Sequence, residues 1–269
     1  MTFGMIGCGK MGESILAALL RSDTVAPAEV TVCDKLPERR TDLQRAYAVN
    51  VTDAPAQVAA AADLVMLAVK PQDMAPAAAS AAPSLSDRHL LVSIAAGKRL
   101  VDLRALFPNG RLARVMPNLP ATVSMGMSAF CCEDGAPPED RKTVRRLLES
   151  FGSAIDLPEA QFDAFTALAG SGPAFVARLV QAMAHGAVAL GMDRDQALEA
   201  ARRTFAGTAM LLEQGAVDED GLVQAVSSPG GTTVAGRQVL EASDMPDVLA
   251  ATLQAAAQRG AELARASNA

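Results

Sequence analysis

The chain has 269 residues, of which half are hydrophobic and only 3% aromatic, and its formal net charge is −6. This length suits one large domain or two ordinary ones. No basic run or stripe occurs, and no apolar run is long enough to cross a membrane, so we expect neither nucleic acid nor a membrane as a partner. The N-terminus enters an apolar segment without a signal-peptide pattern, and we expect a cytoplasmic protein.

The first motif is a glycine-rich turn between a predicted strand, residues 2–6, and a predicted helix, residues 13–21. It reads Gly7, Cys8, Gly9, Lys10, Met11 and Gly12. A G-x-G-x-x-G pattern alone is weak evidence, but a strand before it and a helix after it are the context that dinucleotide binding needs. Gly7 permits the tight turn, Gly9 lets a pyrophosphate approach, and Gly12 lets helix and strand pack closely.

A second predicted strand, residues 29–33, ends at Asp34, where an acid that binds ribose belongs. A carboxylate there favours the 2′-hydroxyl of NAD and repels the 2′-phosphate of NADP. Lys35, Arg39 and Arg40 follow at once and could pair with that phosphate, or they could lie in solvent at a helix start. This segment leaves the choice between the two cofactors open.

Strands continue to alternate with helices up to residue 157. Strands are predicted at 63–69, 90–94 and 111–116, with helices at 72–82 and 99–106. This alternation indicates a mostly parallel sheet, in which ligands bind beyond the carboxyl ends of the strands. Lys70, the segment 95–97 and Asn118 lie at such ends. Two edge strands, 127–132 and 154–157, are expected to flank a charged helix at 138–150.

From residue 158 onward the strand signals stop and helices follow one another. They are predicted at 162–190, with a break at 169–175, and at 195–213, 222–226, 234–240 and 245–264. The break contains small residues and a proline, which indicates a kink with close backbone approach. These helices are too apolar to be stable alone in water, so we expect at least a homodimer.

The corner at residues 226–233 separates two of these helices. Pro229, Gly230 and Gly231 end the first helix, and the next begins with free N–H groups from about Gly231 to Thr233. Such a helix start is suited to a carboxylate. The simpler interpretation is a helix–turn–helix corner capped by Ser and Thr.

The four cysteines are Cys8, Cys33, Cys131 and Cys132. They form no Cys-x-x-Cys pair and have no histidine nearby, so we expect buried free thiols and no metal site.

Together these motifs resemble the pyrroline-5-carboxylate reductase family along nearly the whole chain. The resemblance rests on six segments, which are 7–12, 68–71, 93–97, 114–118, 170–174 and 228–233. The first is generic to nucleotide-binding proteins, and the last two, at this separation, are specific to the family. The resemblance implies an α/β fold, with a Rossmann-like dinucleotide-binding domain at 1–157 and an all-α substrate-binding and dimerisation domain at 158–269.

The family also implies a reaction, in which NAD(P)H reduces 1-pyrroline-5-carboxylate to L-proline, in homodimers or larger rings. NADPH is the expected donor, and NADH is possible. Thr233 would hydrogen-bond the substrate nitrogen, the amides of Thr232 and Thr233 would hold its carboxylate, and Gly231 belongs to the same corner. Val226, Gly172 and Pro173 would shape the pocket. The implied cofactor residues beyond the glycine motif are Asp34, Lys35, Ala68, Val69, Lys70, Pro71, Ala95, Ala96, Gly97 and Asn118.

Three positions depart from the family pattern: Leu119 replaces a usual Thr, Phe175 a common Tyr, and Pro55 an Asn near the adenosine. They leave cofactor preference and pocket shape open, and the role of the acidic Glu213 is open too.

Three rival classes are weighed. A hydroxyacid dehydrogenase that relies on histidine is disfavoured, because His89 precedes a strand and His185 is expected to pack on a helix or lie at the surface. The β-hydroxyacid dehydrogenases rely on a lysine in the helical half, and this chain has none after Lys142. A nucleotide sensor would need the glycine motif but not the corner.

Overall fold

The computed structural model describes residues 2–266, which divide into two compact units. One unit comprises Met1–Ser171 and Ala255–Ala269, and the other comprises Gly172–Gln254. The border follows Ser171, whereas the sequence placed it after residue 157. The reason is visible in the packing: Phe162 and Phe165 are buried against Ala129 and Cys131 of the sheet, so this segment belongs to the first unit.

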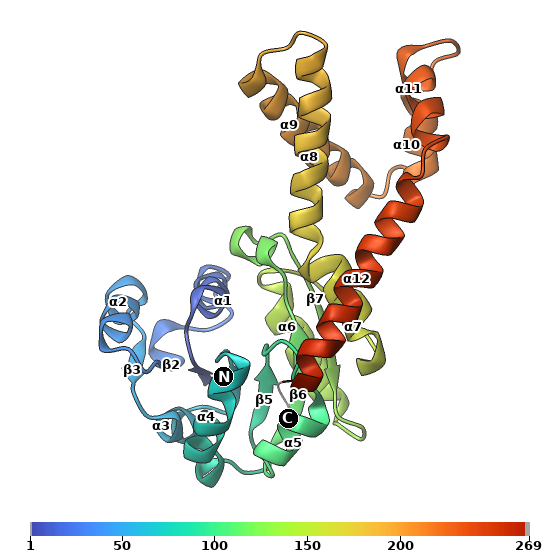
Figure 1. Ribbon diagram of the computed structural model, residues 1–269. Coiled ribbons are helices and arrows are strands. Elements are labelled where there is room, and N and C mark those ends of the chain that lie inside the picture. Colours follow the sequence, from blue (N-terminus) through green and yellow to red (C-terminus); the bar gives the residue numbers. More distant parts are fainter. Residues whose placement is uncertain (1, 267–269) are drawn as a thin grey trace. The chain divides into compact units, whose positions relative to one another are not determined.

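The first unit is built on one eight-stranded sheet with the order β3-β2-β1-β4-β5-β6-β7-β8 (Figure 1). The strands are β1 (Phe3–Ile6), β2 (Val30–Cys33), β3 (Asn50–Thr52), β4 (Leu64–Leu67), β5 (Leu90–Ser93), β6 (Arg111–Met116), β7 (Gly126–Cys132) and β8 (Gly152–Asp156). All neighbouring pairs are parallel except β6 and β7. The predicted mostly parallel sheet is therefore confirmed.

One expectation about the sheet was wrong, because β7 lies between β6 and β8 instead of at an edge. A short turn of 3₁₀ helix, Leu119–Val123, follows β6 and reverses the chain, so that β7 runs antiparallel to β6. Of the two strands predicted to lie at an edge, only β8 does so, as expected for residues 154–157. The other edge is β3.

Helices cover both faces of the sheet. They are α1 (Lys10–Arg21), α2 (Pro37–Tyr47), α3 (Pro55–Ala61), α4 (Met74–Ala81), α5 (Leu100–Leu106), α6 (Pro138–Glu149) and α7 (Phe162–Phe165). Buried residues of α1, α2 and α6 belong to one core cluster, and those of α3, α4 and α5 to another. In β4, Leu64 and Met66 belong to the first cluster and Val65 and Leu67 to the second, as expected for a strand buried on both faces.

Three elements near the N-terminus were not predicted: β3, α3 and most of α2. Leu43 is the only buried residue of α2, so the helix shows no apolar period of its own. Strand β3 has three residues, none of them buried, and α3 is a short run rich in alanine. These elements form because they pack on β2 and β1, not because of a local pattern.

The second unit is helical throughout its regular structure. It contains α8 (Gly172–Ala189), α9 (Arg194–Glu213), α10 (Glu219–Ala225), α11 (Thr232–Glu241) and the first part of α12 (Met245–Ala266). Its buried cluster joins α8 and α9 through Ala184, Ala197 and Ala201. Helices α10 and α11 bury no residue within the chain. Among the described residues no helix is long and apolar enough to cross a membrane.

The predicted break in the long apolar helix is present. A π-helical turn, Thr166–Gly170, follows α7, and the amide of Ser171 donates to the carbonyl of Thr166. A side chain at Gly170 would place its Cβ 3.1 Å from Cε of Met116. The end of the Met116 side chain therefore packs closely against this turn, and α8 begins after it.

Candidate functional site

The glycine-rich turn has the geometry that a dinucleotide requires. Gly7 has a φ of 82°, and a Cβ there would lie 2.6 Å from Val69, so both conformation and space demand glycine. A Cβ at Gly12 would contact Met5 and the carbonyl of Gly7, in keeping with close packing of helix and strand. Around Gly9 a Cβ would meet nothing within 4 Å, so the backbone is open to a ligand. Gly9 begins α1 without a side-chain cap, which leaves the first-turn amides of the helix for an anion.

A cleft of about 470 Å³ opens beside this turn at the carboxyl ends of β1, β2 and β4. Eight of the predicted cofactor residues line it, which are Gly7, Cys8, Gly9, Asp34, Lys35, Ala68, Val69 and Lys70. Lys10, Met11 and Gly12 form the first turn of α1, and Pro71 begins the turn after Lys70. The structure therefore brings most of the predicted dinucleotide residues to one place.

The sequence did not single out several residues that also line this cleft. They are Ile6, Cys33, Leu36, Asp53, Asp73, Pro76, Ala77 and Ser80. Asp53 follows the unpredicted strand β3. The last four follow β4, and the first three lie at the ends of β1 and β2 or just after β2. Pro55, noted in the sequence as lying near the adenosine, is part of the lining. Asp53 could have been found in the sequence by its position directly after a strand. That strand, β3, was not predicted, so Asp53 was missed.

Asn118 and Gly97, also predicted to contact the cofactor, make contacts within the first unit. The Asn118 side chain is buried; its Nδ2 donates to the carbonyl of Ala169 at 3.1 Å, and its Oδ1 accepts from the amide of Met127 at 2.9 Å. Asn118 thus ties the end of β6 to the π-helical turn. Gly97 has a φ of 77°, and a Cβ there would lie 3.3 Å from Ala264 of α12. Ala95 is buried and Ala96 is exposed. A role for these four residues with the cofactor stays a prediction.

The corner in the second unit has the predicted helix–turn–helix form. Gly230 has a φ of 69°, and Gly231 begins α11 with no side-chain cap. The prediction of a free amide at Gly231 was wrong, because this N–H donates to the carbonyl of Ser228 at 2.9 Å. The uncapped first turn therefore runs from Thr232, so the anion-binding character applies to Thr232 and Thr233. Both threonines and Val226 are exposed, and Gly172 and Pro173 begin α8.

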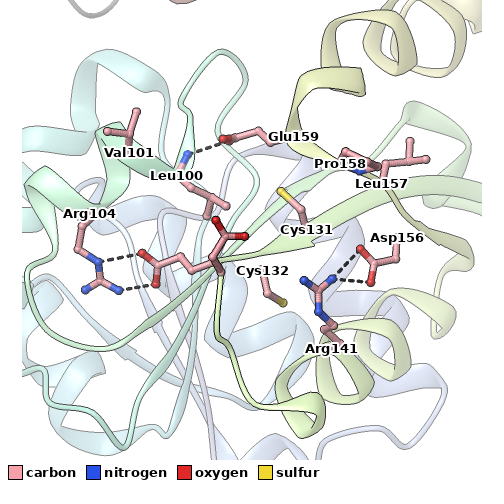
Figure 2. A pocket seen from close by; sticks show the side chains of 12 residues that line it. Leu100, Val101, Arg104, Cys131, Cys132, Arg141, Asp156, Leu157, Pro158 and Glu159 are labelled. Carbon is pink, nitrogen blue, oxygen red and sulfur yellow. Dashed lines mark hydrogen bonds and ion pairs between the residues drawn. The ribbon is translucent and has the colours of Figure 1, made fainter.

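A second cavity, of about 870 Å³, lies on the first unit and shares no lining residue with the cleft beside the glycine turn. Figure 2 shows the side chains that line it. Two arginines point into it, and each is held by a carboxylate: Arg104 by Glu133, and Arg141 by Asp156 at 2.6 Å. Cys131 and Cys132 also line it. Burial raises the pKa of Cys131 to about 12 and that of Cys132 to about 11, so both thiols are neutral at physiological pH.

All four cysteines are free and buried, which confirms the prediction of buried thiols. Burial also raises the pKa of Cys8 to about 12. His89 is buried with Nε2 at 2.9 Å from the carbonyl of Ala59 and Nδ1 accepting from the amide of Ser86. It is a structural histidine. His185 is exposed on α8.

Comparisons with known proteins decide the family. The family model "Pyrroline-5-carboxylate reductase dimerisation" matches residues 159–263, and "NADP oxidoreductase coenzyme F420-dependent" matches residues 2–97. The pyrroline-5-carboxylate reductase of Synechocystis is 37% identical over 262 residues, covering 97% of this chain and 98% of that protein. This chain belongs to the pyrroline-5-carboxylate reductase family. The Escherichia coli enzyme of that family is 36% identical, with 88% of this chain and 89% of that protein covered.

Solved structures of the same family match the fold from end to end. The structure from Coxiella burnetii has a TM-score of 0.93 at 27% identity and covers 97% of this chain and 98% of its own. The structure from Streptococcus pyogenes has a TM-score of 0.80 at 29% identity, with the same coverage of both chains. The family relationship therefore covers the dinucleotide cleft and the helical corner together.

Proposed function

We propose that the protein reduces 1-pyrroline-5-carboxylate to L-proline with a reduced nicotinamide dinucleotide, the last step of proline biosynthesis. One observation carries this proposal: the similarity to pyrroline-5-carboxylate reductases extends over nearly the whole chain, and both predicted motifs fall within it. A dinucleotide-binding sensor would explain the cleft but not the corner. A β-hydroxyacid dehydrogenase would need a lysine that this chain lacks after Lys142.

The substrate is a five-membered ring with one carboxylate and one C=N bond, and the corner supplies groups for both. The uncapped amides of Thr232 and Thr233 bind the carboxylate at the positive end of α11. The Thr233 hydroxyl donates a hydrogen bond to the ring nitrogen, and Val226 gives an apolar wall. Gly172 and Pro173 bound the pocket from the start of α8. A protonated imine is already electrophilic, so no strong acid or base is needed from the protein.

The cleft of the first unit has the features that suit the dinucleotide. The first turn of α1 binds the pyrophosphate, the open backbone at Gly9 admits it, and Asp34 lies at the ribose end. When bound, the reduced nicotinamide supplies the hydride that adds to C5 of the ring. The family resemblance implied NADPH as the donor, with NADH possible. The charges around Asp34 favour NADH over NADPH.

The proposed assembly is a homodimer or a larger ring of dimers. Many large apolar side chains of the second unit are exposed in the single chain, among them Met183, Leu190, Met210, Val239 and Leu240. Such a surface is unstable in water and is buried when two copies associate. The matching model for residues 159–263 is named for dimerisation.

The decisive experiment measures imine-dependent oxidation of the reduced dinucleotide by wild-type protein and by Thr233→Ala. We expect turnover to fall at least tenfold, which corresponds to about 1.4 kcal/mol of lost transition-state stabilisation. Thr233→Ser keeps the hydroxyl and serves as the matched control, with most of the activity retained. Unchanged kinetics in Thr233→Ala would remove the hydroxyl from the mechanism.

A second substrate separates the roles of the amides and the hydroxyl. 1-Pyrroline has the C=N bond but no carboxylate, so its KM should be much higher in the wild-type protein. Thr233→Ala should then lower kcat for both substrates, because the hydroxyl contacts the nitrogen that they share. No turnover of either imine, by a protein that binds the dinucleotide, would contradict the proposed reaction.

A further inference from the structure

The adenosine end of the dinucleotide cleft contains one carboxylate whose orientation is set from two sides. Asp34 follows β2, and its Oδ2 accepts from the amide of Cys8 in the glycine turn at 3.1 Å. Its Oδ1 accepts from the amide of Leu36 at 3.0 Å. Each oxygen keeps a lone pair, since a carboxylate can accept about four hydrogen bonds. The carboxylate therefore lies in the cleft as a prepared acceptor for hydroxyl groups.

Arg39, which the sequence offered as a partner for a 2′-phosphate, is engaged elsewhere. Its Nε donates to the carbonyl of Cys8 at 3.0 Å, and its Nη2 pairs with Glu13, which also accepts from the hydroxyl of Tyr47 at 3.2 Å. The hydrogen bond to Glu13 raises the pKa of Arg39 further. Arg39 does not line the cleft. It supports the glycine turn on the carbonyl side of Cys8, while Asp34 holds the amide side.

The two remaining cations are also matched with acids. Arg40 donates to the backbone carbonyl of Asp34 at 2.8 Å, and its Nη2 lies 3.8 Å from Asp53. Lys35 Nζ lies 3.1 Å from Asp73. The charged residues that line the cleft are therefore three aspartates, Asp34, Asp53 and Asp73, against Lys35 and Lys70. A 2′-phosphate placed here would meet more negative than positive charge.

We infer that Asp34 selects the dinucleotide with a free 2′-hydroxyl, so that NADH binds more tightly than NADPH. The hydroxyl donates to a carboxylate that is already oriented, whereas a phosphate would lie against that carboxylate with no free arginine to offset the repulsion. This inference rests on the proposed use of a nicotinamide dinucleotide. It concerns the preference between two donors, which the family relationship leaves open.

Lys35 is a cation in the lining that a phosphate could recruit at low cost. Its side chain is 74% exposed, and exposed ion pairs such as the one with Asp73 contribute little. With Asp34 neutral, the lining carries two aspartates, Asp53 and Asp73, against two lysines, and Lys35 can leave its exposed pair with Asp73 for the 2′-phosphate. Asp34→Asn should therefore have two effects. It removes the repulsion between the carboxylate and the 2′-phosphate, and it allows Lys35 to pair with that phosphate.

The test is a binding titration without substrate, following nicotinamide fluorescence of NADH and NADPH at fixed ionic strength. We expect wild-type protein to bind NADH at least tenfold more tightly than NADPH. Asp34→Asn should strengthen NADPH binding at least tenfold and weaken NADH binding only severalfold. Asp34→Asn/Lys35→Ala should lose most of the gain for NADPH. Glu139→Gln, an exposed acid on α6, is the matched charge control and should leave both affinities unchanged.

Two results would overturn the inference. One is tighter binding of NADPH than NADH by the wild-type protein. The other is an equal loss of both affinities in Asp34→Asn, because Asp34 would then act only by holding Cys8. Imine turnover measured in the same preparations keeps the two proposals apart. A protein that prefers NADH but reduces no imine would contradict the proposed reaction and leave the inference about Asp34 intact. A protein that reduces the imine but prefers NADPH would support the proposed reaction and contradict the inference about Asp34.

Discussion

The two units differ in how much of their structure one chain completes. The first buries large side chains on both faces of its sheet, among them Phe3, Leu16, Leu103 and Phe107. In the second, the buried cluster consists of three alanines, and α10 and α11 bury nothing. Because both units are similarly rich in apolar residues, we expect the second unit to bury its exposed apolar side chains against another copy in the proposed homodimer. The first unit would then complete its core within one chain, and the second unit would complete its core only in the assembly.

Paired leucines give the largest expected effect and test this difference directly. Leu16 is fully buried in α1, whereas Leu240 on α11 is 52% exposed. Leu16→Ala should lower the free energy of unfolding by about 2–5 kcal/mol at any protein concentration. Leu240→Ala should cost little in protein dilute enough for the proposed dimer to dissociate, because this side chain is half exposed in the single chain. Urea unfolding at low and high protein concentration, with sedimentation to follow the oligomer, measures both. The comparison fails if Leu240→Ala costs as much as Leu16→Ala in the dilute sample.

A smaller effect is expected at Asn118, whose buried amide joins β6 to the π-helical turn. Asn118→Ala leaves the carbonyl of Ala169 and the amide of Met127 without this partner, at a cost of about 1–3 kcal/mol. Asn50→Ala is the matched control. Its side chain also makes two hydrogen bonds, in this case by donating to the carbonyls of Ala28 and Val30, but it is exposed, so water replaces the lost bonds. Equal losses in the two variants would contradict the importance of burial here.

The first unit was also the easier one to predict from the sequence. Strands buried on both faces, such as β1 and β4, are continuous apolar runs that end at functional turns, and both fold and glycine motif follow from them. β3 and α2 were missed because their stability comes from neighbours, not from a local period. The predicted edge position of β7 was wrong, because the sequence does not show where in the sheet, or in which direction, the chain returns after the turn that follows β6.

At the candidate site, residue types were predictable but their partners were not. Asp34 was placed correctly at the end of β2, and the structure shows it in the cleft. Arg39 and Arg40 looked equivalent in sequence, since both follow Asp34 closely. A long arginine side chain binds whichever acceptor the fold brings near, and Glu13 and the Cys8 carbonyl come from a different element. At the corner, the hydrogen bond from Gly231 to Ser228 depends on the turn conformation, which the sequence left open.

Gly231 permits a sharper test of the corner. Its backbone φ is −78°, so any residue could adopt it, but a Cβ would lie 2.4 Å from Oγ and 3.0 Å from the carbonyl oxygen of Ser228. Gly231→Ala should therefore displace Ser228 and the start of α11, and we expect imine turnover to fall about tenfold while dinucleotide binding stays unchanged. Gly236→Ala in the same helix meets nothing within 4 Å. It should keep full activity and stabilise α11 by about 0.5–1 kcal/mol. A fully active Gly231→Ala variant would show that the corner tolerates movement.

The smallest expected effect concerns an exposed ion pair on α9. Arg203 and Glu199 lie one turn apart, with side chains 83% and 64% exposed in the single chain. In a monomer, Arg203→Ala should change the free energy of unfolding by no more than about 0.5 kcal/mol, and the change should vanish at high salt. Lys142→Ala removes a similarly exposed pair, with Glu139, from α6 of the first unit and is the control. If the two variants behave alike at every protein concentration, the outer face of α9 is solvent-facing in the assembly. A larger loss in Arg203→Ala alone, growing with protein concentration, would place this face in the interface between copies.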